Sequence, residues 1–532
     1  MPHTKTGYAQ SDVTTSFSGG VWKDMIRFGM GALFIVVAVF YSIRFGAGEP
    51  SLILLMAVAV GGYMAMNIGA NDVANNVGPA VGSKALTLGS ALVIAAIFEA
   101  AGALIAGGDV VGTIRSGIIH PGFIRDPNVF VWLMLAALLA GALWLNIATA
   151  VGAPVSTTHS IVGAVLGAGM AAAGPEIVNW STMGGIAASW VISPVLGGLF
   201  AAGFLYLVKH SITYQQDMSE AARRTVPLLI GFMVAIFTTY LILKGLNKVW
   251  KVGFGAAMVY GLITGAVVFL GVRGYLGRRG DLAANTKESV NQLFNVPLVF
   301  AAALLSFAHG SNDVANAIGP LAAIVDIVSG SGEVTKSAPI PVWVMMLGAL
   351  GISVGLALFG PKVIRTVGSE ITELDQMRAY CIAMGATITV IVASQFGLPV
   401  SSTHIAVGGV FGVGFLREYL KTNYDLMLAE IHAHHRATGD TAEVEVFIRE
   451  FESASIEEKG EMLRELKART KMAETSSPVS KGERKELKKL HKRELVKRSQ
   501  VIRIAAAWVI TVPASAFMAA MLYFTIRGMM LP

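Results

Sequence analysis

An aspartate inside an asparagine-rich phrase occurs twice in this chain of 532 residues. Asn71-Asp72-Val73-Ala74-Asn75 returns 241 residues later as Asn312-Asp313-Val314-Ala315-Asn316. Both copies lie in long apolar stretches, where a carboxylate is costly and marks a candidate binding site more often than a helix cap. Carboxylate and amide oxygens are the ligands that hard cations such as Na⁺ prefer. We therefore expect a cation site formed by Asn71, Asp72, Asn75, Asn312, Asp313 and Asn316.

A second phrase follows each copy and is rich in hydroxyl groups. Pro154-Val155-Ser156-Thr157-Thr158-His159 returns 245 residues later as Pro399-Val400-Ser401-Ser402-Thr403-His404. Proline suits the first turn of a helix, so the hydroxyls fall where unpaired N–H groups and the helix dipole attract an anion. Serine and threonine can also simply bond back to their own helix. The repetition in the same order favours an anion site formed by Ser156, Thr157, Thr158, Ser401, Ser402 and Thr403, with Asp72 and Asp313.

The charges predict coupling to a cation. Two aspartates and a divalent oxyanion would bring about four negative charges into a low-dielectric site, and two helix dipoles offset about one of them. Na⁺ or H⁺ must supply the rest. An ionised carboxylate accepts hydrogen bonds and never donates them, so aspartates facing the anion favour phosphate, which still carries a proton, over sulfate.

Three further residues are candidates for a proton or ion path. Glu99 lies in an apolar run with no cation near it in the sequence, and His159 and His404 end the two hydroxyl-rich phrases. Each histidine can equally be a hydrogen-bonded packing residue. His309 stands where the first copy has Ile68, and we expect it to have a structural role.

The composition indicates a membrane protein. The chain is 54% hydrophobic and 14% charged, with a mean hydropathy of +0.62, whereas about a quarter of the residues of a soluble chain are charged. Apolar runs of about 20 residues span a bilayer as helices, and longer runs such as Ala379–Leu416 must contain a hairpin or a broken helix. We predict an all-α polytopic membrane protein of about 12 transmembrane helices, with two inverted repeats that contain broken helices and hairpins.

The same composition excludes other classes. Short alternating segments typical of a transmembrane β-barrel do not occur, and the single cysteine, Cys381, excludes a disulfide within the chain. The net charge of +7 comes from cations that sit mostly in loops, which indicates membrane orientation rather than nucleic-acid binding.

The chain divides into seven predicted parts. Phe28–Ile43 is interpreted as a retained helix because no small-residue cleavage motif follows it. A helix should break at Asn71 and Asp72, and a polar link should carry Asp109, Arg115 and His120. The predicted boundaries are a polar N-terminal tail (1–27), an additional transmembrane helix (28–44), a first transport repeat (51–208), a linker with two transmembrane helices (209–295), a second transport repeat (296–417), a cytoplasmic basic helical loop (418–500), and a final transmembrane helix with a short tail (501–532).

These motifs resemble the inorganic phosphate transporter (PiT) family of ion-coupled symporters. The likeness covers about residues 51–416 and Trp508–Pro513, and it includes Ile97-Phe98-Glu99 and Thr113–Ile119. It implies an inverted-repeat fold with phosphate between the repeats, bound by the hydroxyls at 156–158 and 401–403 with the two aspartates, and Na⁺ bound with the help of the asparagines. The chain departs from the family in having Ala383 where many members carry a glutamate, and in its additional first helix.

We therefore expect a secondary active symporter, not an enzyme, that imports inorganic phosphate with Na⁺ or H⁺ by alternating access. A symporter of sulfate or another oxyanion on the same fold is the alternative, and an intramembrane hydrolase is a remote one because no nucleophile elbow or zinc motif occurs. No cofactor is expected beyond the co-transported Na⁺ or H⁺. The expected location is the bacterial inner membrane, with the lipid bilayer as partner and a homodimer left open.

Overall fold

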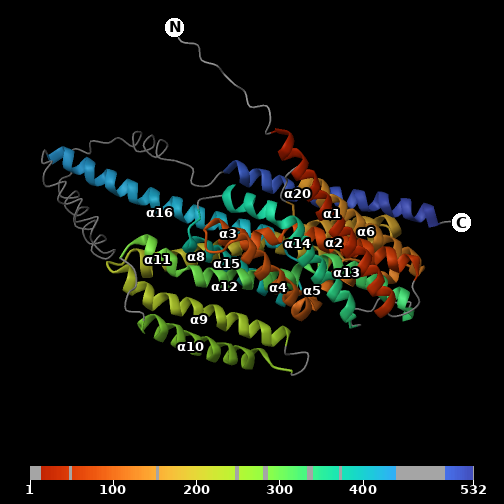
Figure 1. Ribbon diagram of the computed structural model, residues 1–532, viewed down its shortest axis with the longest axis horizontal. Helices are drawn as coiled ribbons and strands as arrows, with labels where there is room; N and C mark the ends of the chain where they lie inside the picture. Colours follow the sequence, from red (N-terminus) through yellow and green to blue (C-terminus); the bar gives the residue numbers. More distant parts are fainter. Residues whose placement is uncertain are drawn as a thin grey trace, which may run out of the picture.

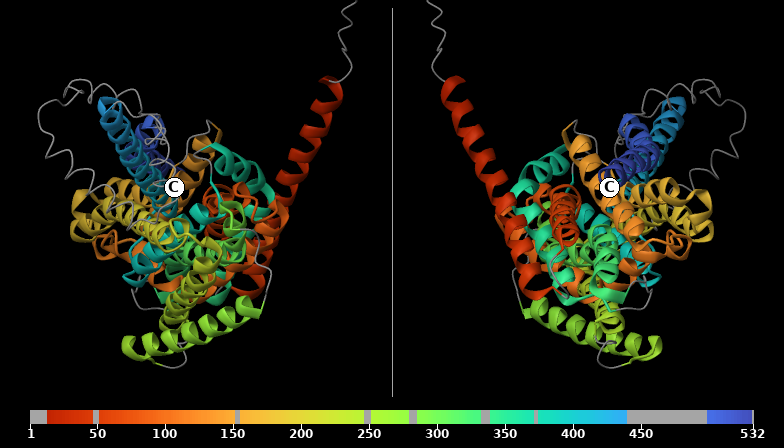
Figure 2. Two further views of the ribbon diagram at one scale, coloured as in Figure 1. Left: turned by 90° about the vertical axis from the view of Figure 1, so that its left-hand side faces the viewer. Right: turned by 90° about the vertical axis from the view of Figure 1, so that its right-hand side faces the viewer.

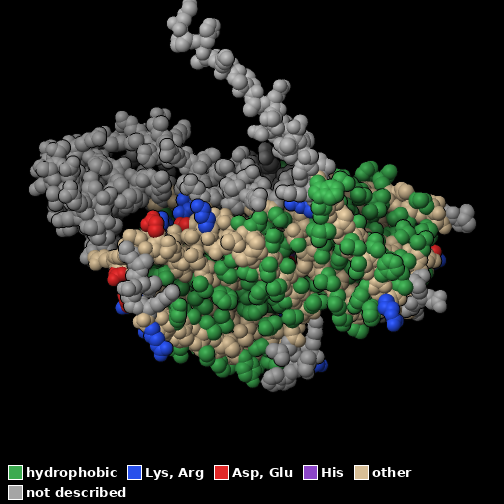
Figure 3. All heavy atoms as spheres, viewed as in Figure 1, with side chains coloured by type: hydrophobic (Ala, Val, Ile, Leu, Met, Phe, Trp, Pro, Cys, Tyr) green, Lys and Arg blue, Asp and Glu red, His purple; other side chains and the backbone are tan. Residues whose placement is uncertain are grey.

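The computed structural model describes residues 13–46, 51–150, 155–245, 251–278, 285–331, 339–370, 374–438 and 498–530. Within these ranges the chain is helical, with one isolated bridge pairing Ile119 and Val178. Eleven spans in the described residues are long and apolar enough to cross a membrane. Apolar side chains dominate the visible face, and the charged groups lie near its margins (Figure 3). The prediction of an all-α, multi-pass membrane protein is confirmed.

The first part of the chain forms a peripheral helix and a broken span, followed by a helix pair and a hairpin. Helix α1 is the additional helix, and α6 and α7 form the hairpin. The helices are α1 (Val13–Phe45), α2 (Leu52–Asn71), α3 (Val73–Gly82), α4 (Leu88–Ala106), α5 (Gly108–Ser116), α6 (Pro127–Ala150), α7 (Thr157–Ala173) and α8 (Trp180–Val208).

The second part follows two linking spans and again contains a broken span, α12 with α13, and a hairpin, α15 with α16. Helices α9 and α10 pack against each other at one edge of the bundle (Figure 1). The helices are α9 (Met218–Lys244), α10 (Phe254–Arg278), α11 (Lys287–Leu293), α12 (Asn295–Asp313), α13 (Ala315–Asp326), α14 (Val342–Glu370), α15 (Gln376–Gln395), α16 (Ser402–Thr438) and α20 (Arg498–Met530).

Glycines let the central helices cross at backbone distance. A Cβ added at Gly102 of α4 would lie 2.0 Å from the carbonyl oxygen of Phe307 in α12, and one at Gly310 of α12 would lie 2.2 Å from that of Glu99 in α4. A contact of the same kind joins α2 to α14, where a Cβ added at Gly69 would lie 1.9 Å from the carbonyl oxygen of Ile352. Small residues at such crossings are how membrane helices pack without side chains between them.

The two aspartate phrases lie at breaks between helices, as predicted. Asp72 separates α2 from α3 with φ −87° and ψ −33°, and its N–H still donates to the carbonyl of Ile68 at 3.0 Å. In the second copy α12 ends at Asp313 and α13 begins at Ala315. Each break is therefore a local interruption that leaves the two pieces nearly continuous.

The run Ala379–Leu416 contains a hairpin, as predicted. Helix α15 ends at Gln395 and α16 begins at Ser402. The intervening turn includes Gly397, whose φ of +66° is in the left-handed region that glycine adopts readily.

Three expectations differ from the structure. Helix α1 begins at Val13, well before the predicted tail boundary at residue 27, and it leans along one flank of the bundle (Figure 2). The predicted polar link contains the helix α5, which packs against α13 and buries Arg115 in an ion pair with Asp326. An ion partner on a distant helix made burial of this arginine favourable, and the local sequence does not show that partner.

Helix α16 continues beyond residue 417, where we expect the second repeat to end, as far as Thr438. The basic loop predicted for 418–500 lies largely outside the described residues, which resume at residue 498.

Candidate functional site

Asp72 and Asp313 meet at one hydroxyl group. Thr157 Oγ1 lies 2.7 Å from Asp72 Oδ2 and 3.3 Å from Asp313 Oδ2. The exposed fractions of the two aspartates are 1% and 0%. A single hydroxyl has one proton to donate, so Thr157 donates to one carboxylate at a time.

The helix start of the second copy reaches the same carboxylates. Thr403 Oγ1 donates to Asp72 Oδ1 at 3.2 Å, and Ser402 Oγ lies 3.4 Å from Asp313 Oδ2. Thr157 and Ser402 are the residues 245 positions apart, and each contacts the aspartate of its own copy. The four motif segments therefore form one buried cluster, although they are spread from residue 72 to residue 403.

Both hydroxyl-rich phrases begin helices, as the prolines predicted. Ser156 is the N-cap of α7 and its Oγ accepts from the N–H of His159 at 3.1 Å; Ser401 caps α16 by accepting from His404 at 3.3 Å. In each helix the capping serine pairs with the third N–H group. The N–H groups of Thr157, Thr158, Ser402 and Thr403 remain, and they make no hydrogen bond to described residues.

The four asparagines divide into two pairs. Asn75 Nδ2 donates to Thr403 Oγ1 at 2.9 Å, and Asn316 Nδ2 donates to both Thr157 and Thr158 at 3.1 Å. Each of these asparagines thus contacts the helix start of the other copy. They belong to the cluster that surrounds the carboxylates.

Asn71 and Asn312 turn away from the carboxylates. Asn71 Nδ2 donates to Thr149 at 3.0 Å, and Asn312 Nδ2 donates to Ser394 and to the carbonyl of Leu398, both at 3.0 Å. Asn312 Oδ1 also accepts from Val400 N–H at 3.2 Å. Asn312 holds the turn between α15 and α16, so the structure does not bring these two asparagines together with Asp72 and Asp313.

His309 joins the carboxylates to Glu99. Its Nδ1 lies 2.7 Å from Glu99 Oε2, and its Nε2 lies 3.1 Å from Asp313 Oδ2. Asn76 donates to Glu99 Oε1 at 2.8 Å. His309, which we expected to be structural, is therefore part of the site. The missed signal was its position four residues before Asp313, which places both side chains on one face of α12.

His159 and His404 lie in the first turns of α7 and α16, and their rings contact each other. The carboxylates are contacted by the neighbouring threonines, Thr157 and Thr403. The two histidine rings are 4.5 Å apart between centroids and nearly perpendicular, and Trp190 packs on His159 at 3.9 Å. Trp190 Nε1 donates to the carbonyl of Pro399 at 3.1 Å. The histidines pack against each other here and make no contact with Asp72 or Asp313 that would place them in the same cluster.

The electrostatics of the cluster favour a bound cation. One ligand atom each from Asp72, His309 and Asp313 lies within 4.8 Å of the others, and all three residues are buried. Two unit charges at that distance repel by about 3 kcal/mol at an effective dielectric constant near 20. Removing both carboxylates from water adds a further cost. A cation between them, or protons on them, offsets both.

Comparisons with known proteins identify related chains. The model of the "Phosphate transporter family" matches residues 68–519. A protein of Helicobacter pylori (strain J99) named "Putative phosphate permease" is 51% identical over 509 residues, which cover 94% of this chain and 95% of that protein. A permease of the same description from Pyrococcus abyssi is 41% identical over 373 residues, covering 68% of this chain and 89% of its own length.

A solved structure is also similar. The chain described as "The sodium-dependent phosphate transporter" superposes with a TM-score of 0.72 at 30% sequence identity, and the match covers 90% of the present chain and all of that chain.

Proposed function

This chain belongs to the phosphate transporter family, and on that premise we propose that it imports inorganic phosphate together with Na⁺ by alternating access. Phosphate transport follows from the family. The coupling ion, the direction and the residue roles are the proposal. Because the family consists of transporters, the interpretation of the chain as an intramembrane hydrolase is excluded.

The observation that carries the proposal is the pair of carboxylates on Thr157. Asp72 and Asp313 come from broken helices in the two copies, and both are buried within hydrogen-bonding reach of one hydroxyl. Such a pair needs positive charge beside it. Asp72 and Asp313 supply carboxylate oxygens here, which suit Na⁺, and the amide nitrogens of Asn75 and Asn316 bond the threonines beside them. The sodium dependence named for the similar solved structure supports the same ion.

The two helix starts supply the donors for phosphate. Four backbone N–H groups, from Thr157 and Thr158 in α7 and from Ser402 and Thr403 in α16, have no partner among the described residues. Free N–H groups at helix N-termini bind oxyanions. The hydroxyls of Thr157, Ser402 and Thr403 add donors that can face the phosphate oxygens once a cation replaces them at the aspartates, whereas Thr158 Oγ1 donates to the carbonyl of Val400 at 2.9 Å.

Coupling follows from charge. Phosphate cannot approach two ionised aspartates in a buried site unless Na⁺ neutralises them first. Na⁺ in turn stays bound to the carboxylates until the site opens to water, because an unpaired buried carboxylate is costly. Co-binding of anion and cation therefore stabilises a closed, neutralised site, and the empty site opens again.

Glu99 and His309 are proposed to complete the cation environment or to move a proton. His309 contacts both Glu99 and Asp313, so a proton on His309 would substitute for a cation beside Asp313. His159 and His404 are proposed to act through packing between the helix starts.

Uptake of labelled phosphate into vesicles that contain the purified protein tests the proposal. Na⁺ and pH gradients are varied separately, with sulfate as competitor. We expect an inward Na⁺ gradient to drive uptake at constant pH and excess sulfate to leave uptake unchanged. Uptake that follows only the pH gradient would contradict Na⁺ coupling, and equal competition by sulfate would contradict phosphate selectivity.

A further inference from the structure

Four uncharged polar side chains form a cluster beside the site on α2 and α6. We call Asn67, Asn71, Asn146 and Thr149 the amide cluster. Asn146 Nδ2 donates to Asn67 Oδ1 at 2.8 Å, and Asn71 Nδ2 donates to Thr149 Oγ1 at 3.0 Å. Asn146 and Thr149 are exposed, and Asn67 and Asn71 are half-buried.

Backbone carbonyls fix the orientation of two of these amides. Asn67 Nδ2 also donates to the carbonyl of Tyr63 at 2.9 Å, and Asn146 Nδ2 donates to the carbonyl of Ala142 at 3.0 Å. A carbonyl accepts and never donates, so the nitrogen of each amide must face its own helix. The amide oxygens of Asn67 and Asn146 consequently face away from the helix carbonyls, and Asn146 Oδ1 accepts no hydrogen bond from a described residue.

The cluster therefore presents oxygen atoms. Four of the six amide N–H groups donate to neighbours, and both N–H groups of Asn146 are among them. Lone pairs remain on Asn146 Oδ1, Asn67 Oδ1, Asn71 Oδ1 and Thr149 Oγ1. A hard monovalent cation takes neutral amide and hydroxyl oxygens as ligands.

The position of the cluster connects it to the carboxylates. Asn71 is the last residue of α2 and directly precedes Asp72, and Thr149 lies in the last turn of α6. Exposed amides are costly against hydrocarbon and are found where water reaches the helices. We infer from the exposure of Asn146 and Thr149 that water reaches this face of α2 and α6.

We propose that the amide cluster is an outer cation site, which takes Na⁺ from water and passes it to Asp72. The inference rests on the proposed Na⁺ coupling and adds a second place where the ion stops. Neutral ligands hold the ion more weakly than carboxylates do, which lets it move on.

The corresponding residues in the second copy are sealed. At the spacings of the two phrases, Ala308, Asn312, Ile391 and Ser394 stand in place of Asn67, Asn71, Asn146 and Thr149, and their exposed fractions are 0%, 1%, 7% and 1%. Two of the four polar groups are replaced by apolar ones. The second copy therefore has no exposed polar cluster at the positions that correspond to the amide cluster.

The Na⁺ concentration that gives half-maximal phosphate uptake tests the site. Asn146→Leu removes a ligand oxygen, and Thr149→Val removes another with almost no change in shape. We expect each to raise that concentration about five-fold, the loss of one polar contact, while the half-saturating phosphate concentration at saturating Na⁺ stays at the wild-type value. Ile147→Val, an exposed apolar neighbour on α6, is the matched control and should change neither.

A labelling measurement gives a readout that does not depend on uptake. Cys381 is fully buried, so a thiol introduced by Asn146→Cys reacts on a low background. We expect a membrane-impermeant thiol reagent to modify it, and Na⁺ to slow the reaction where the same concentration of N-methylglucamine does not. Val191→Cys, on an exposed apolar face of α8, should stay unmodified.

The outcomes separate this inference from the proposed function. Wild-type uptake that depends on Na⁺, together with unchanged Na⁺ dependence in Asn146→Leu and Thr149→Val, would overturn the outer site alone. A thiol at position 146 that does not react, or reacts at a rate insensitive to Na⁺, would overturn it as well. Wild-type uptake independent of Na⁺ would instead contradict the coupling on which the site rests.

Discussion

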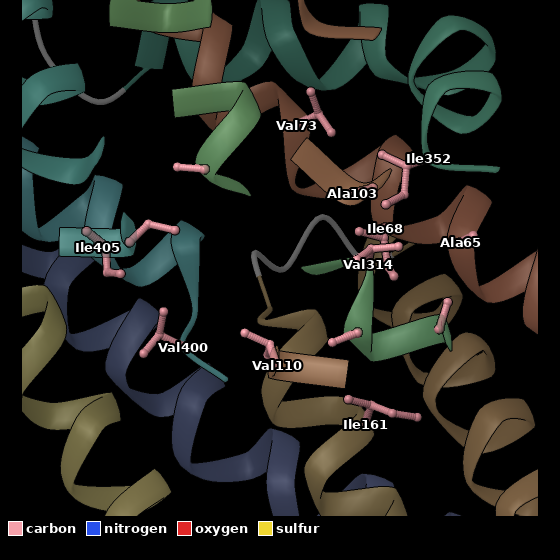
Figure 4. Close-up of a cluster of buried hydrophobic side chains, with 14 of the residues drawn as sticks. Ala65, Ile68, Val73, Ala103, Val110, Ile161, Val314, Ile352, Val400 and Ile405 are labelled. Carbon is pink, nitrogen blue, oxygen red and sulfur yellow. The ribbon is translucent and has the colours of Figure 1, made fainter. Parts of the chain in front are cut away.

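The crossing of α4 with α12 and the crossing of α2 with α14 share one backbone design and bury different chemistry. Gly102 and Gly310 make the first crossing, and Gly69 and Gly355 make the second, with each Cβ position 1.9 to 2.2 Å from a facing carbonyl oxygen. The first crossing holds the polar set Asn76, Glu99 and His309. At the same spacings, the second holds Ile352 and Ile68 (Figure 4) and Ala317, all fully buried.

The two crossings therefore share a backbone contact and differ in the charge that they bury. Both crossings place an aspartate three residues beyond the glycine, and both aspartates reach Thr157. Asp313 is the aspartate that lies 3.1 Å from His309, which in turn contacts Glu99. We infer that the two aspartates are not equivalent, and that Asp313 belongs to the half in which charge can be passed on.

The largest loss of phosphate uptake is expected from replacing either aspartate, Asp72 or Asp313. Asp72→Asn and Asp313→Asn should each lower Na⁺-driven phosphate uptake by about 100-fold or more, since a ligand that interacts as a charged group contributes up to about 3 kcal/mol. Asp126→Asn, an exposed aspartate before α6, is the control. Uptake is measured in vesicles after gel filtration has shown that each variant is folded. Strong uptake by either buried-site variant would refute the assignment of that aspartate.

The second prediction makes the two crossings alike. The triple variant Asn76→Ala, Glu99→Ile, His309→Ile gives the α4–α12 crossing the residues of the other one. Replacing a buried ionic set by apolar residues is often neutral or stabilising, so we expect the protein to fold with an unchanged melting temperature. Na⁺-driven uptake should fall by about 10-fold or more, because an ion ligand or proton carrier is missing.

This outcome distinguishes a functional set from a structural one. A folded triple variant with wild-type uptake would show that the polar set serves neither the ion nor the proton, and an unfolded one would show that it holds the crossing together. Ser353→Ala, which removes a hydroxyl that bonds the carbonyl of Ala96 on α4, is the control for disturbance of this neighbourhood.

The third prediction concerns the backbone contacts that the two crossings share. Gly69→Ala and Gly310→Ala each force a Cβ against a facing carbonyl. Overpacking of this kind costs about 1–3 kcal/mol, so both variants should melt at lower temperature in detergent, by similar amounts. Gly89→Ala meets nothing within 4 Å and should melt no lower than the wild type. A lower melting temperature for one of these two variants and an unchanged one for the other would mean that the crossings differ in backbone packing as well as in chemistry.

The smallest expected effect concerns the turn between α15 and α16. Thr113 Oγ1 donates to the carbonyl of Gly397 at 2.7 Å, and Lys244 contacts Asp109 and the carbonyl of Gln395. Thr113→Val loses one hydrogen bond of about 1 kcal/mol. We expect a thiol at the fully buried position 400 (Val400→Cys) to react about five-fold faster in this background. Thr264→Val, which affects only a bond within α10, should leave the rate unchanged.

Local sequence signals predicted the parts of the site and tertiary contacts decided how they combine. Proline and serine order identified both helix starts, and Asn-Asp identified both breaks, because capping and turn preferences act within a few residues. The contact of Glu99 with His309 joins residues 210 apart. No local preference contains such a pair, so Glu99 lacked a visible partner and His309 was interpreted as structural.

The asparagines illustrate the same limit. Asn71 corresponds to Asn312 and Asn75 to Asn316 in the two phrases, and the sequence predicted that all four bind a cation. The structure instead directs Asn75 and Asn316 toward the opposite helix start, and Asn71 and Asn312 toward the neighbouring hairpin. The helical spacing of four residues puts both members of a phrase on nearly one face, and the packing around each decides which neighbour it meets.

The glycine contacts also determine which pieces travel together when the site changes its access. Helix α4 precedes α12 by about 200 residues, yet they touch backbone to backbone, as do α8 and α16 through Gly408 and α7 and α20 through Gly167. Sliding of such helices would press backbone on backbone, so we infer that each pair moves as one body if the site changes its access. The moving units would then combine early and late parts of the chain.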